Sequence, residues 1–418
     1  MKIGIPKERR DDERRAAASA DTVKRYKALG LEPVVEAGAG EGAAISDQAF
    51  ADAGAAINPN GAAWDAEIVL KVQRPTDDEL ARLKQGQVLI GMLDPYNSRE
   101  QVDAYAKAGV TAFSMELLPR TTRAQAMDVL SSQANLAGYK ALIDAMAQYA
   151  RVLPMMMTAA GTVTPAKVFI VGAGVAGLQA IATARRMGAV VTATDVRPAA
   201  REETESLGAK FVGFVPSDAA TKGGYARPLT PEEQAEQAKM VAEHLKTQDI
   251  VVTTAQIPGR KAPRIITAEM VRSMKPGAVV LDMAAESGGN VEGSVPGEVV
   301  SVGGIKLIGA KNPHPNLATG LNRIGLLHTF VNSRQRLQFL QPLYIRLQRF
   351  TAGPRACRRQ RFRRRHQHGL RTNRLNLFVM RRNGIHHFGV FAVLLSNLRT
   401  QHGMRAFFLV TDGLSDIV

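Results

Sequence analysis

A glycine-rich turn between a strand pattern and a helix pattern constrains this 418-residue chain more than any other feature. The apolar stretch 167–171 leads into three glycines with the spacing GxGxxG, and helical periodicity follows at once. In such a turn the first glycine makes the tight bend, the second lets the backbone approach a pyrophosphate, and the third brings helix and strand close together. The stretch therefore predicts a dinucleotide site. The alternative interpretation is that these glycines only form a tight turn in a fold that binds no nucleotide. Its candidate cofactor contacts are Gly172, Gly174, Val175, Ala176 and Gly177.

An acidic residue ends the next predicted strand, 18 residues after the last of these glycines. A carboxylate at this position accepts hydrogen bonds from the adenosine ribose and repels a 2′-phosphate, so Asp195 favours NAD over NADP. Arg197 is a contrary sign, because an arginine here can accommodate that phosphate. We expect Asp195, Val196 and Arg197 to form the ribose end of the cofactor site.

Short apolar stretches alternate with amphipathic helical patterns along most of the first 311 residues. Such alternation indicates a parallel sheet with helices on both faces. We therefore expect an α/β protein with two Rossmann-like parallel-sheet domains, over 1–133 and 134–311, with a helix at about 125–149 joining them. Three methionines at 155–157 follow this helix and are expected to fill the core, as clustered methionines usually do.

The end of a later strand is a second candidate contact with the cofactor. Parallel sheets present ligands at the carboxyl ends of their strands. The strand predicted over 249–255 ends in Thr253, Thr254 and Ala255. We expect Thr254 and Ala255 to contact the cofactor at this edge.

Several longer motifs carry a resemblance to a known family. They are GIPKERRDDERRAAASADTV, KVQRP, SMELLPRTTRAQAMDVLSSQANLAGYKA, TTAQIPGRKAP and AAESGGN, together with PMMMTAAGTVTPAKVFIVGAGVAGLQAIATARRMGAVVTATDVRPA. In these motifs, from residue 1 to about 311, the chain closely resembles the NAD(H)-binding alpha subunits of proton-translocating nicotinamide nucleotide transhydrogenases. These subunits belong to the alanine dehydrogenase/transhydrogenase superfamily.

The resemblance implies that the chain binds NAD(H) and passes hydride between NADH and NADP⁺ held on a partner subunit. It also implies a homodimer, and a membrane-embedded partner that couples the exchange to proton translocation. We expect a cytoplasmic protein, because the apolar run 388–395 is shorter than the ~18 residues of a membrane span. The resemblance further implies that it is peripheral on the inner face of the cell membrane. The single cysteine excludes an internal disulfide, and no signal peptide is evident.

The same resemblance implies a nicotinamide site in the segment PRTTRAQAMDVLS. Its catalytic residues would be Arg120, Gln125 and Asp128, with Ser131 as a further contact. Gln125, Asp128 and Ser131 recur every three residues and can share one side of a helix start. The alternative is a solvated helix terminus capped by Asp and Ser. Tyr225 matches the tyrosine of a mobile loop that closes over the nucleotide in the family. The alternative interpretation is a flexible surface loop in which Tyr225 is an exposed aromatic residue.

Alanine dehydrogenase is the alternative enzyme in this superfamily. Members of that group carry a catalytic His and a catalytic Asp where this chain has Asp94 and Glu286. Oxidative deamination needs a general base, whereas direct hydride transfer needs only binding and alignment of the two rings. The transhydrogenase is therefore favoured. Arg15 and Lys71 match substrate-binding residues of the dehydrogenases. We expect them to have only a structural role here, retained from a shared ancestor.

The net charge of +16 comes entirely from the end of the chain. Residues 1–311 carry 36 basic and 36 acidic side chains, whereas 312–418 carry 18 arginines, no lysine and two acidic residues. This Arg-rich tail does not match the family, and we expect an out-of-frame, poorly ordered segment from a GC-rich gene. Activity of the chain alone is therefore in doubt. The tail shows no metal-ligand spacing and no nucleic-acid motif, so we expect no metal and no nucleic-acid partner. A nucleic-acid-binding tail remains a third alternative.

Overall fold

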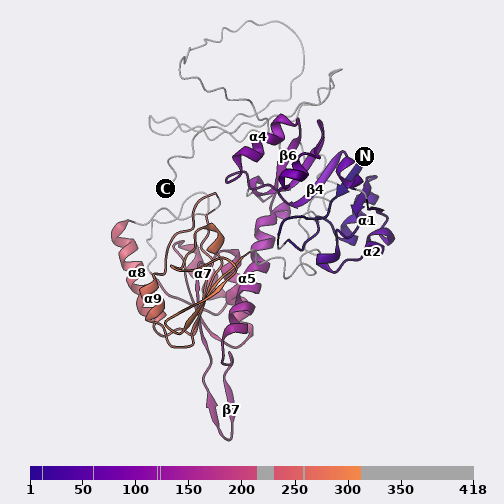
Figure 1. Cartoon of the computed structure of the whole chain (residues 1–418). Helices are drawn as coiled ribbons and strands as arrows, with labels where there is room; N and C mark the ends of the chain where they lie inside the picture. The colour runs from indigo at the N-terminus through magenta and orange to yellow at the C-terminus, as the bar shows by residue number, and fades with distance from the viewer. Residues whose placement is uncertain are drawn as a thin grey trace, which may run out of the picture. The chain divides into compact units, whose positions relative to one another are not determined.

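Two mainly parallel sheets with intervening helices organise the portion of the chain that the structure describes (Figure 1). The computed structural model describes residues 1–11, 13–59, 61–119, 121–122, 124–213, 230–257 and 259–311. Arg120, Tyr225 and the Arg-rich tail lie outside these ranges. Within them the α/β fold class predicted from the sequence is confirmed. No helix in these ranges has the length and apolarity that crossing a bilayer requires.

The first sheet has six parallel strands in the order β3-β2-β1-β4-β5-β6. Its strands are β1 (Lys2–Ile5), β2 (Glu32–Glu36), β3 (Ala56–Asn58), β4 (Ile68–Gln73), β5 (Val88–Met92) and β6 (Thr111–Ser114). The helices between them are α1 (Ala20–Ala28), α2 (Asp47–Asp52), α3 (Asp77–Leu80) and α4 (Arg99–Lys107). Short 3-10 turns are η1 (Glu41–Ala43), η2 (Ala62–Asp65), η3 (Met115–Leu117) and η4 (Gln125–Met127).

Strand β4 shows how this sheet is buried on both faces. Val69 packs with Trp64 in one apolar cluster, whereas Leu70 and Val72 pack with Ile5 in the other. Each fully buried side chain of this size contributes about 1.5–3 kcal/mol to stability. A strand buried on both faces is apolar at consecutive positions, and for this reason the sequence lacks simple alternation here.

The second sheet has seven strands in the order β11-β10-β9-β12-β13-β15-β14. Its strands are β9 (Lys167–Val171), β10 (Val190–Thr194), β11 (Lys210–Phe211), β12 (Ile250–Thr253), β13 (Val279–Asp282), β14 (Val299–Val302) and β15 (Ile305–Gly309). Its helices are α6 (Val175–Arg186), α7 (Ala199–Ser206), α8 (Pro231–Leu245) and α9 (Ala268–Arg272), with the 3-10 turn η5 (Ala285–Ser287). The edge strand β14 pairs antiparallel with β15, a feature that the sequence did not predict.

Helix α5 (Val129–Gln148) contributes to the cores of both sheets. Val129 lies in a core cluster of the first sheet, and Leu142 and Ala145 lie in a cluster of the second. Gly138 lets α5 approach α6 closely, because a Cβ there would lie 2.0 Å from the Ala176 carbonyl oxygen. The boundary expected between residues 133 and 134 falls inside this helix.

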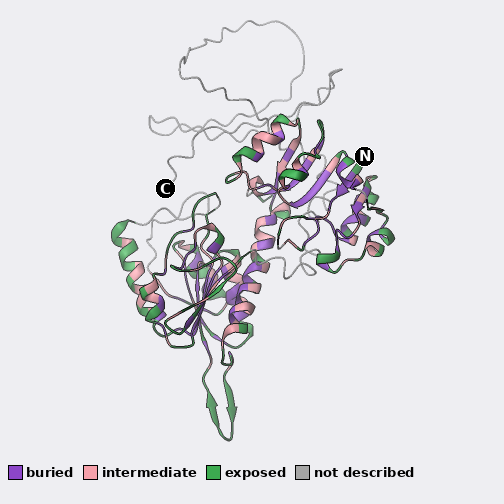
Figure 2. Ribbon diagram, viewed as in Figure 1, coloured by how far each residue is buried: buried purple, intermediate pink, exposed green. Residues whose placement is uncertain are grey.

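The strands β7 (Met156–Thr158) and β8 (Gly161–Val163) form an antiparallel hairpin that is exposed along its whole length (Figures 1 and 2). Met155, Met156 and Met157 are 59%, 47% and 72% exposed. The expectation that these methionines fill the core is therefore wrong. A two-stranded hairpin has no helix or second sheet to cover its faces, so its side chains remain in solvent.

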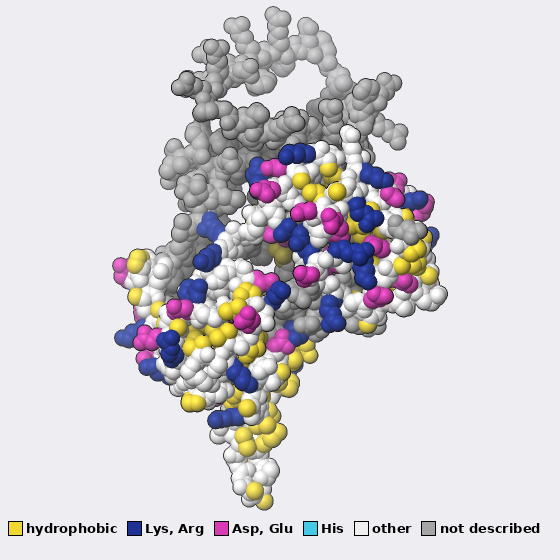
Figure 3. Space-filling model, in the orientation of Figure 1, with side chains coloured by type: hydrophobic (Ala, Val, Ile, Leu, Met, Phe, Trp, Pro, Cys, Tyr) yellow, Lys and Arg dark blue, Asp and Glu magenta, His cyan; other side chains and the backbone are white. Residues whose placement is uncertain are grey.

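Charges on the described surface are mixed in sign. Figure 3 shows lysine and arginine side chains interspersed with aspartate and glutamate over the face in view. This distribution agrees with the equal numbers of basic and acidic residues in 1–311.

Candidate functional site

The glycine turn lies between β9 and α6, where two of its glycines are required by packing. Gly172 has φ +98°, and a Cβ there would lie 2.7 Å from Thr254 Oγ1. A Cβ at Gly177 would lie 1.8 Å from the Gly172 carbonyl oxygen. At Gly174, apart from the residue itself and its two chain neighbours, no atom of the described residues lies within 4 Å of the Cβ position. The turn therefore contains two glycines that permit close packing and one that leaves open space.

Helix α6 presents its amino end without a side-chain cap. It begins at Val175, and its N-cap residue Gly174 has no side chain to accept a hydrogen bond. The first N–H groups of a helix lack intrahelical partners and lie at the positive end of the helix dipole. With the open space at Gly174, this end can accept the pyrophosphate of a dinucleotide. Val175 is exposed there, whereas the Ala176 carbonyl faces α5.

Asp195 connects the end of β10 to the glycine turn. Its carboxylate accepts hydrogen bonds from Ala173 N at 2.7 Å and from Arg197 N at 2.8 Å. The Arg197 guanidinium bends back toward the same turn, and its Nε lies 3.2 Å from Asp195 Oδ1. Val196, between them, is exposed. The carboxylate that the sequence predicts for ribose recognition is thus held at the edge of the turn.

Thr254 and Ala255 lie beside the same turn. Thr254 Oγ1 donates to the Gly172 carbonyl at 3.0 Å. Ala255 N donates to Asn290 Oδ1 at 3.0 Å, and Asn290 Nδ2 donates to the carbonyls of Ala255 and Pro263, each at 2.8 Å. The structure therefore brings together the end of β12 and the glycine turn, as the sequence predicted for a parallel sheet.

Two buried polar residues of this site escaped sequence-based prediction. Asn290 is fully buried, and two of the bonds just described hold the backbone of Ala255 while the third holds that of Pro263. Asp282, also fully buried, accepts from Thr253 Oγ1 at 3.1 Å and from Ser294 Oγ at 2.7 Å. The motif AAESGGN was the available signal for Asn290, but the sequence does not reveal which backbone its amide contacts.

The segment implied to hold nicotinamide lies at the start of α5. Gln125 is exposed in η4, and Asp128 is the N-cap of the helix. Asp128 accepts from Ser131 N at 2.9 Å and from Ser131 Oγ at 2.6 Å. Hydrogen bonds of this kind are those of a capped helix terminus, the alternative given for this segment. The catalytic roles of Gln125 and Asp128 stay predictions. Arg120 lies outside the described residues.

A buried charge cluster in the first sheet holds two cations, Lys71 and Arg15. Lys71 Nζ lies 3.1 Å from Glu8 Oε2 and 2.9 Å from Glu79 Oε1. Arg15 Nη2 lies 2.6 Å from Glu13 Oε2. All of these side chains are almost completely buried, and burial raises the pKa of the Glu8 carboxyl to about 7. Both cations are neutralised by acidic groups of the chain itself.

The turn after β5 contains Asp94, whose φ is +49°. The Glu116 carboxylate accepts from Leu93 N at 3.1 Å and from Asp94 N at 2.8 Å, which holds the turn in place. Glu286 lies in η5. Among the described residues, no group of three or more His, Cys, Asp or Glu side chains is arranged to hold a metal ion.

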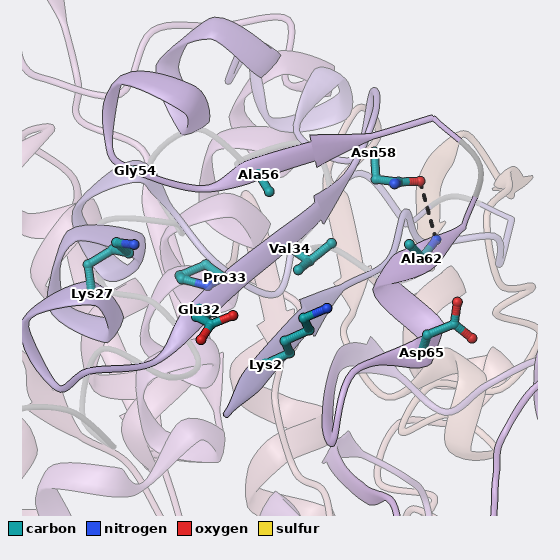
Figure 4. A pocket seen from close by; sticks show the side chains of 10 residues that line it. All are labelled: Lys2, Lys27, Glu32, Pro33, Val34, Gly54, Ala56, Asn58, Ala62 and Asp65. Carbon is teal, nitrogen blue, oxygen red and sulfur yellow. Dashed lines mark hydrogen bonds between the residues drawn. The ribbon is translucent and has the colours of Figure 1, made fainter.

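Two open hollows lie at the amino ends of strands, one in each sheet, whereas the candidate dinucleotide site lies at carboxyl ends. One, of about 570 Å³, is lined by Lys2, Lys27, Glu32 and Asp65 among others (Figure 4). The other, of about 530 Å³, includes Lys167, at the start of β9. Ligands of parallel sheets bind at the carboxyl ends, so neither hollow belongs to the candidate dinucleotide site.

Comparisons with known proteins agree over most of the chain. The alanine dehydrogenase/PNT N-terminal domain matches residues 4–137, and the corresponding C-terminal domain matches 141–320. An NAD(P) transhydrogenase subunit alpha polypeptide of Rhodospirillum rubrum is 52% identical over 322 residues, covering 75% of this chain and 84% of the relative. Alanine dehydrogenase of Mycobacterium tuberculosis is 33% identical over 307 residues, covering 71% and 76%. The crystal structure of a transhydrogenase from Sinorhizobium meliloti aligns with a TM-score of 0.73 and 52% identity, covering 79% of this chain and 91% of that one.

Proposed function

This chain belongs to the alanine dehydrogenase/PNT family, and we propose that it is the NAD(H)-binding component of a proton-translocating NAD(P) transhydrogenase. The observation that carries the proposal is the glycine turn. There, open space at Gly174, the uncapped start of α6 and the Asp195 carboxylate adjoin one another. A dinucleotide needs these three features for its pyrophosphate and its ribose.

The residues of the chain bind and align rather than transfer protons. NAD(H), when bound, supplies the hydride, which passes to NADP⁺ on a partner subunit. The start of α6 receives the pyrophosphate, and Asp195 accepts hydrogen bonds from ribose hydroxyls. Arg120, Gln125 and Asp128 orient the nicotinamide ring. Holding the donor ring in place lowers the entropic contribution to the barrier for transfer.

The buried charge cluster supports a transhydrogenase over the alanine dehydrogenase alternative. Arg15 and Lys71 are paired with acidic side chains, so an amino acid carboxylate would have to displace Glu13 or Glu8. Asp94 in place of the dehydrogenase His leaves the expected base position without an imidazole. Purified chain incubated with NAD⁺ and L-alanine should form no NADH, and robust NADH formation would favour the dehydrogenase.

The proposal includes a NADP(H)-binding subunit and a membrane-embedded subunit as partners, at the inner face of the cell membrane. It also includes a homodimer. The exposed hairpin supports the dimer, because Met155, Met156, Met157 and Val163 present apolar side chains that a second copy can cover. Tyr225 closes over the nucleotide in this proposal.

Two measurements test the function. Titration with NADH should show saturable binding that NADPH does not match. Addition of the membrane and NADP-binding subunits should then permit hydride transfer from NADH to an NADP⁺ analogue. Both measurements are repeated on a comparison protein. It keeps residues 1–311 and replaces the Arg-rich tail with the sequence that the gene encodes once the reading frame is restored. Failure of both chains to bind NADH would refute the proposal, whereas failure of the present chain alone would locate the defect in its C-terminal segment.

A further inference from the structure

The Arg197 side chain is held by three separate groups. Its Nη2 donates to the Ala173 carbonyl at 2.9 Å, and its Nε lies 3.2 Å from Asp195 Oδ1. Nη2 also lies 3.4 Å from Glu203 Oε2 on helix α7. Arg197 is the residue whose position after β10 would suit a 2′-phosphate. Its guanidinium is instead directed to the glycine turn and to two carboxylates.

The charges around this guanidinium disfavour a second anion. Asp195 and Glu203 are two carboxylates around one guanidinium, so the cluster carries an excess negative charge. A 2′-phosphate placed here would meet both carboxylates and would have to draw Arg197 away from at least one of them. A ribose hydroxyl requires no such rearrangement, because it can donate to Asp195 while the arginine keeps its contacts.

Glu203 reaches Arg197 from a different element than Asp195 does. Helix α7 carries three glutamates, and Glu203 is half-buried whereas Glu202 and Glu205 are exposed. Glu203 forms an ion pair with Arg197 across the short segment that separates β10 from α7. This pair keeps the guanidinium on the side of α7 and of the Ala173 carbonyl.

We propose that Glu203 determines nucleotide specificity by holding Arg197 in a conformation that rejects the 2′-phosphate of NADP(H). The inference rests on the proposed NAD(H) site and adds to it a residue that neither the glycine motif nor the strand-end aspartate identifies. Loss of the Glu203 charge frees Arg197 to meet a 2′-phosphate and leaves the Asp195 contact with the ribose intact.

The test is the ratio of NADPH to NADH affinity in the full chain, measured by fluorescence titration. Glu203→Gln should raise the affinity for NADPH relative to NADH about fivefold, equivalent to about 1 kcal/mol, the upper value for a partly exposed ion pair. Glu202→Gln is the matched control, since it removes the same charge from the same helix without a contact to Arg197. It should leave the ratio unchanged.

The Glu203→Gln change is also made in the Arg197→Ala variant. This double variant distinguishes an effect that acts through Arg197 from the simple removal of a negative charge. In Arg197→Ala, the Glu203→Gln change should bring no gain in NADPH affinity. The inference is overturned if Glu203→Gln leaves the ratio unchanged, if Glu202→Gln changes it equally, or if the gain persists without Arg197. Absence of NADH binding to the unmutated chain would instead refute the proposed function. Circular dichroism melting checks that each variant is folded.

Discussion

Alanine substitution at two glycines of one turn should separate packing from cofactor binding. At Gly177 the new methyl carbon would lie 1.8 Å from the Gly172 carbonyl oxygen, a separation that real contacts do not reach. Helix α6 must therefore shift away from β9. Overpacking of this kind costs about 1–3 kcal/mol or more, and the better helix propensity of alanine returns at most ~1 kcal/mol. We expect Gly177→Ala to lower the free energy of unfolding by about 2 kcal/mol, within the range for overpacking.

Gly174→Ala adds the same methyl group three residues earlier with a different consequence. Beyond its chain neighbours, the described part of the chain places no atom within 4 Å of the new position, and the backbone there, with φ −71° and ψ −169°, suits any residue. Alanine is a poorer N-cap than glycine, but it also loses less backbone entropy on folding. Stability should therefore change by less than about 1 kcal/mol. The methyl group occupies space into which the pyrophosphate must approach, so NADH should bind about tenfold or more weakly.

The assay is a pair of measurements on both variants. Urea unfolding followed by far-ultraviolet circular dichroism reports stability, and fluorescence titration reports NADH affinity. The reasoning is refuted if Gly174→Ala is destabilised as strongly as Gly177→Ala, since the space at Gly174 would then be filled by protein. It is also refuted if Gly174→Ala binds NADH as the unmutated chain does.

Other regions of the molecule lead to four further predictions. Asn290→Ala removes three buried hydrogen bonds, each worth about 1 kcal/mol, and should lower both the urea midpoint and NADH affinity. The raised pKa of Glu8, about 7 against an ordinary 4.5, means that the folded chain binds a proton more tightly than the unfolded one. The free energy of unfolding should therefore fall as the pH rises from 4.5 to 7, by up to about 1.4 kcal/mol per unit. Glu8→Gln should flatten this dependence in urea titrations at successive pH values. Met157→Asp should shift the proposed dimer toward monomer in sedimentation, and an unchanged mass would exclude the hairpin from the interface. Resequencing of the gene should reveal an insertion or deletion at the start of segment 312–418, and a verified frame without one would contradict the out-of-frame origin.

Features encoded by consecutive residues could be predicted from the sequence. The strand, the GxGxxG turn and the following helix adjoin one another in the chain, and each has its own local signal in apolar runs, glycine spacing and helical periodicity. Asp195 could be found in the same way, because it ends the next strand. Alternation of strands and helices likewise predicted two parallel sheets.

Contacts that depend on where side chains are directed could not be predicted in this way. Asn290 binds the backbone of Ala255 from 35 positions away, and Glu203 pairs with Arg197, six positions before it, although no local sequence pattern relates the two. The methionines at 155–157 have the apolar character of core residues, yet they lie in an exposed hairpin.

The sequence by itself therefore determined the class of fold, the turn that can receive a dinucleotide and the carboxylate beside it. Only the tertiary structure decided which buried amide holds the backbone after β12 and where the Arg197 guanidinium is directed. The physical reason is that backbone turns and periodicity depend on neighbouring residues, whereas the environment of a side chain depends on which strand ends and helices fold against it.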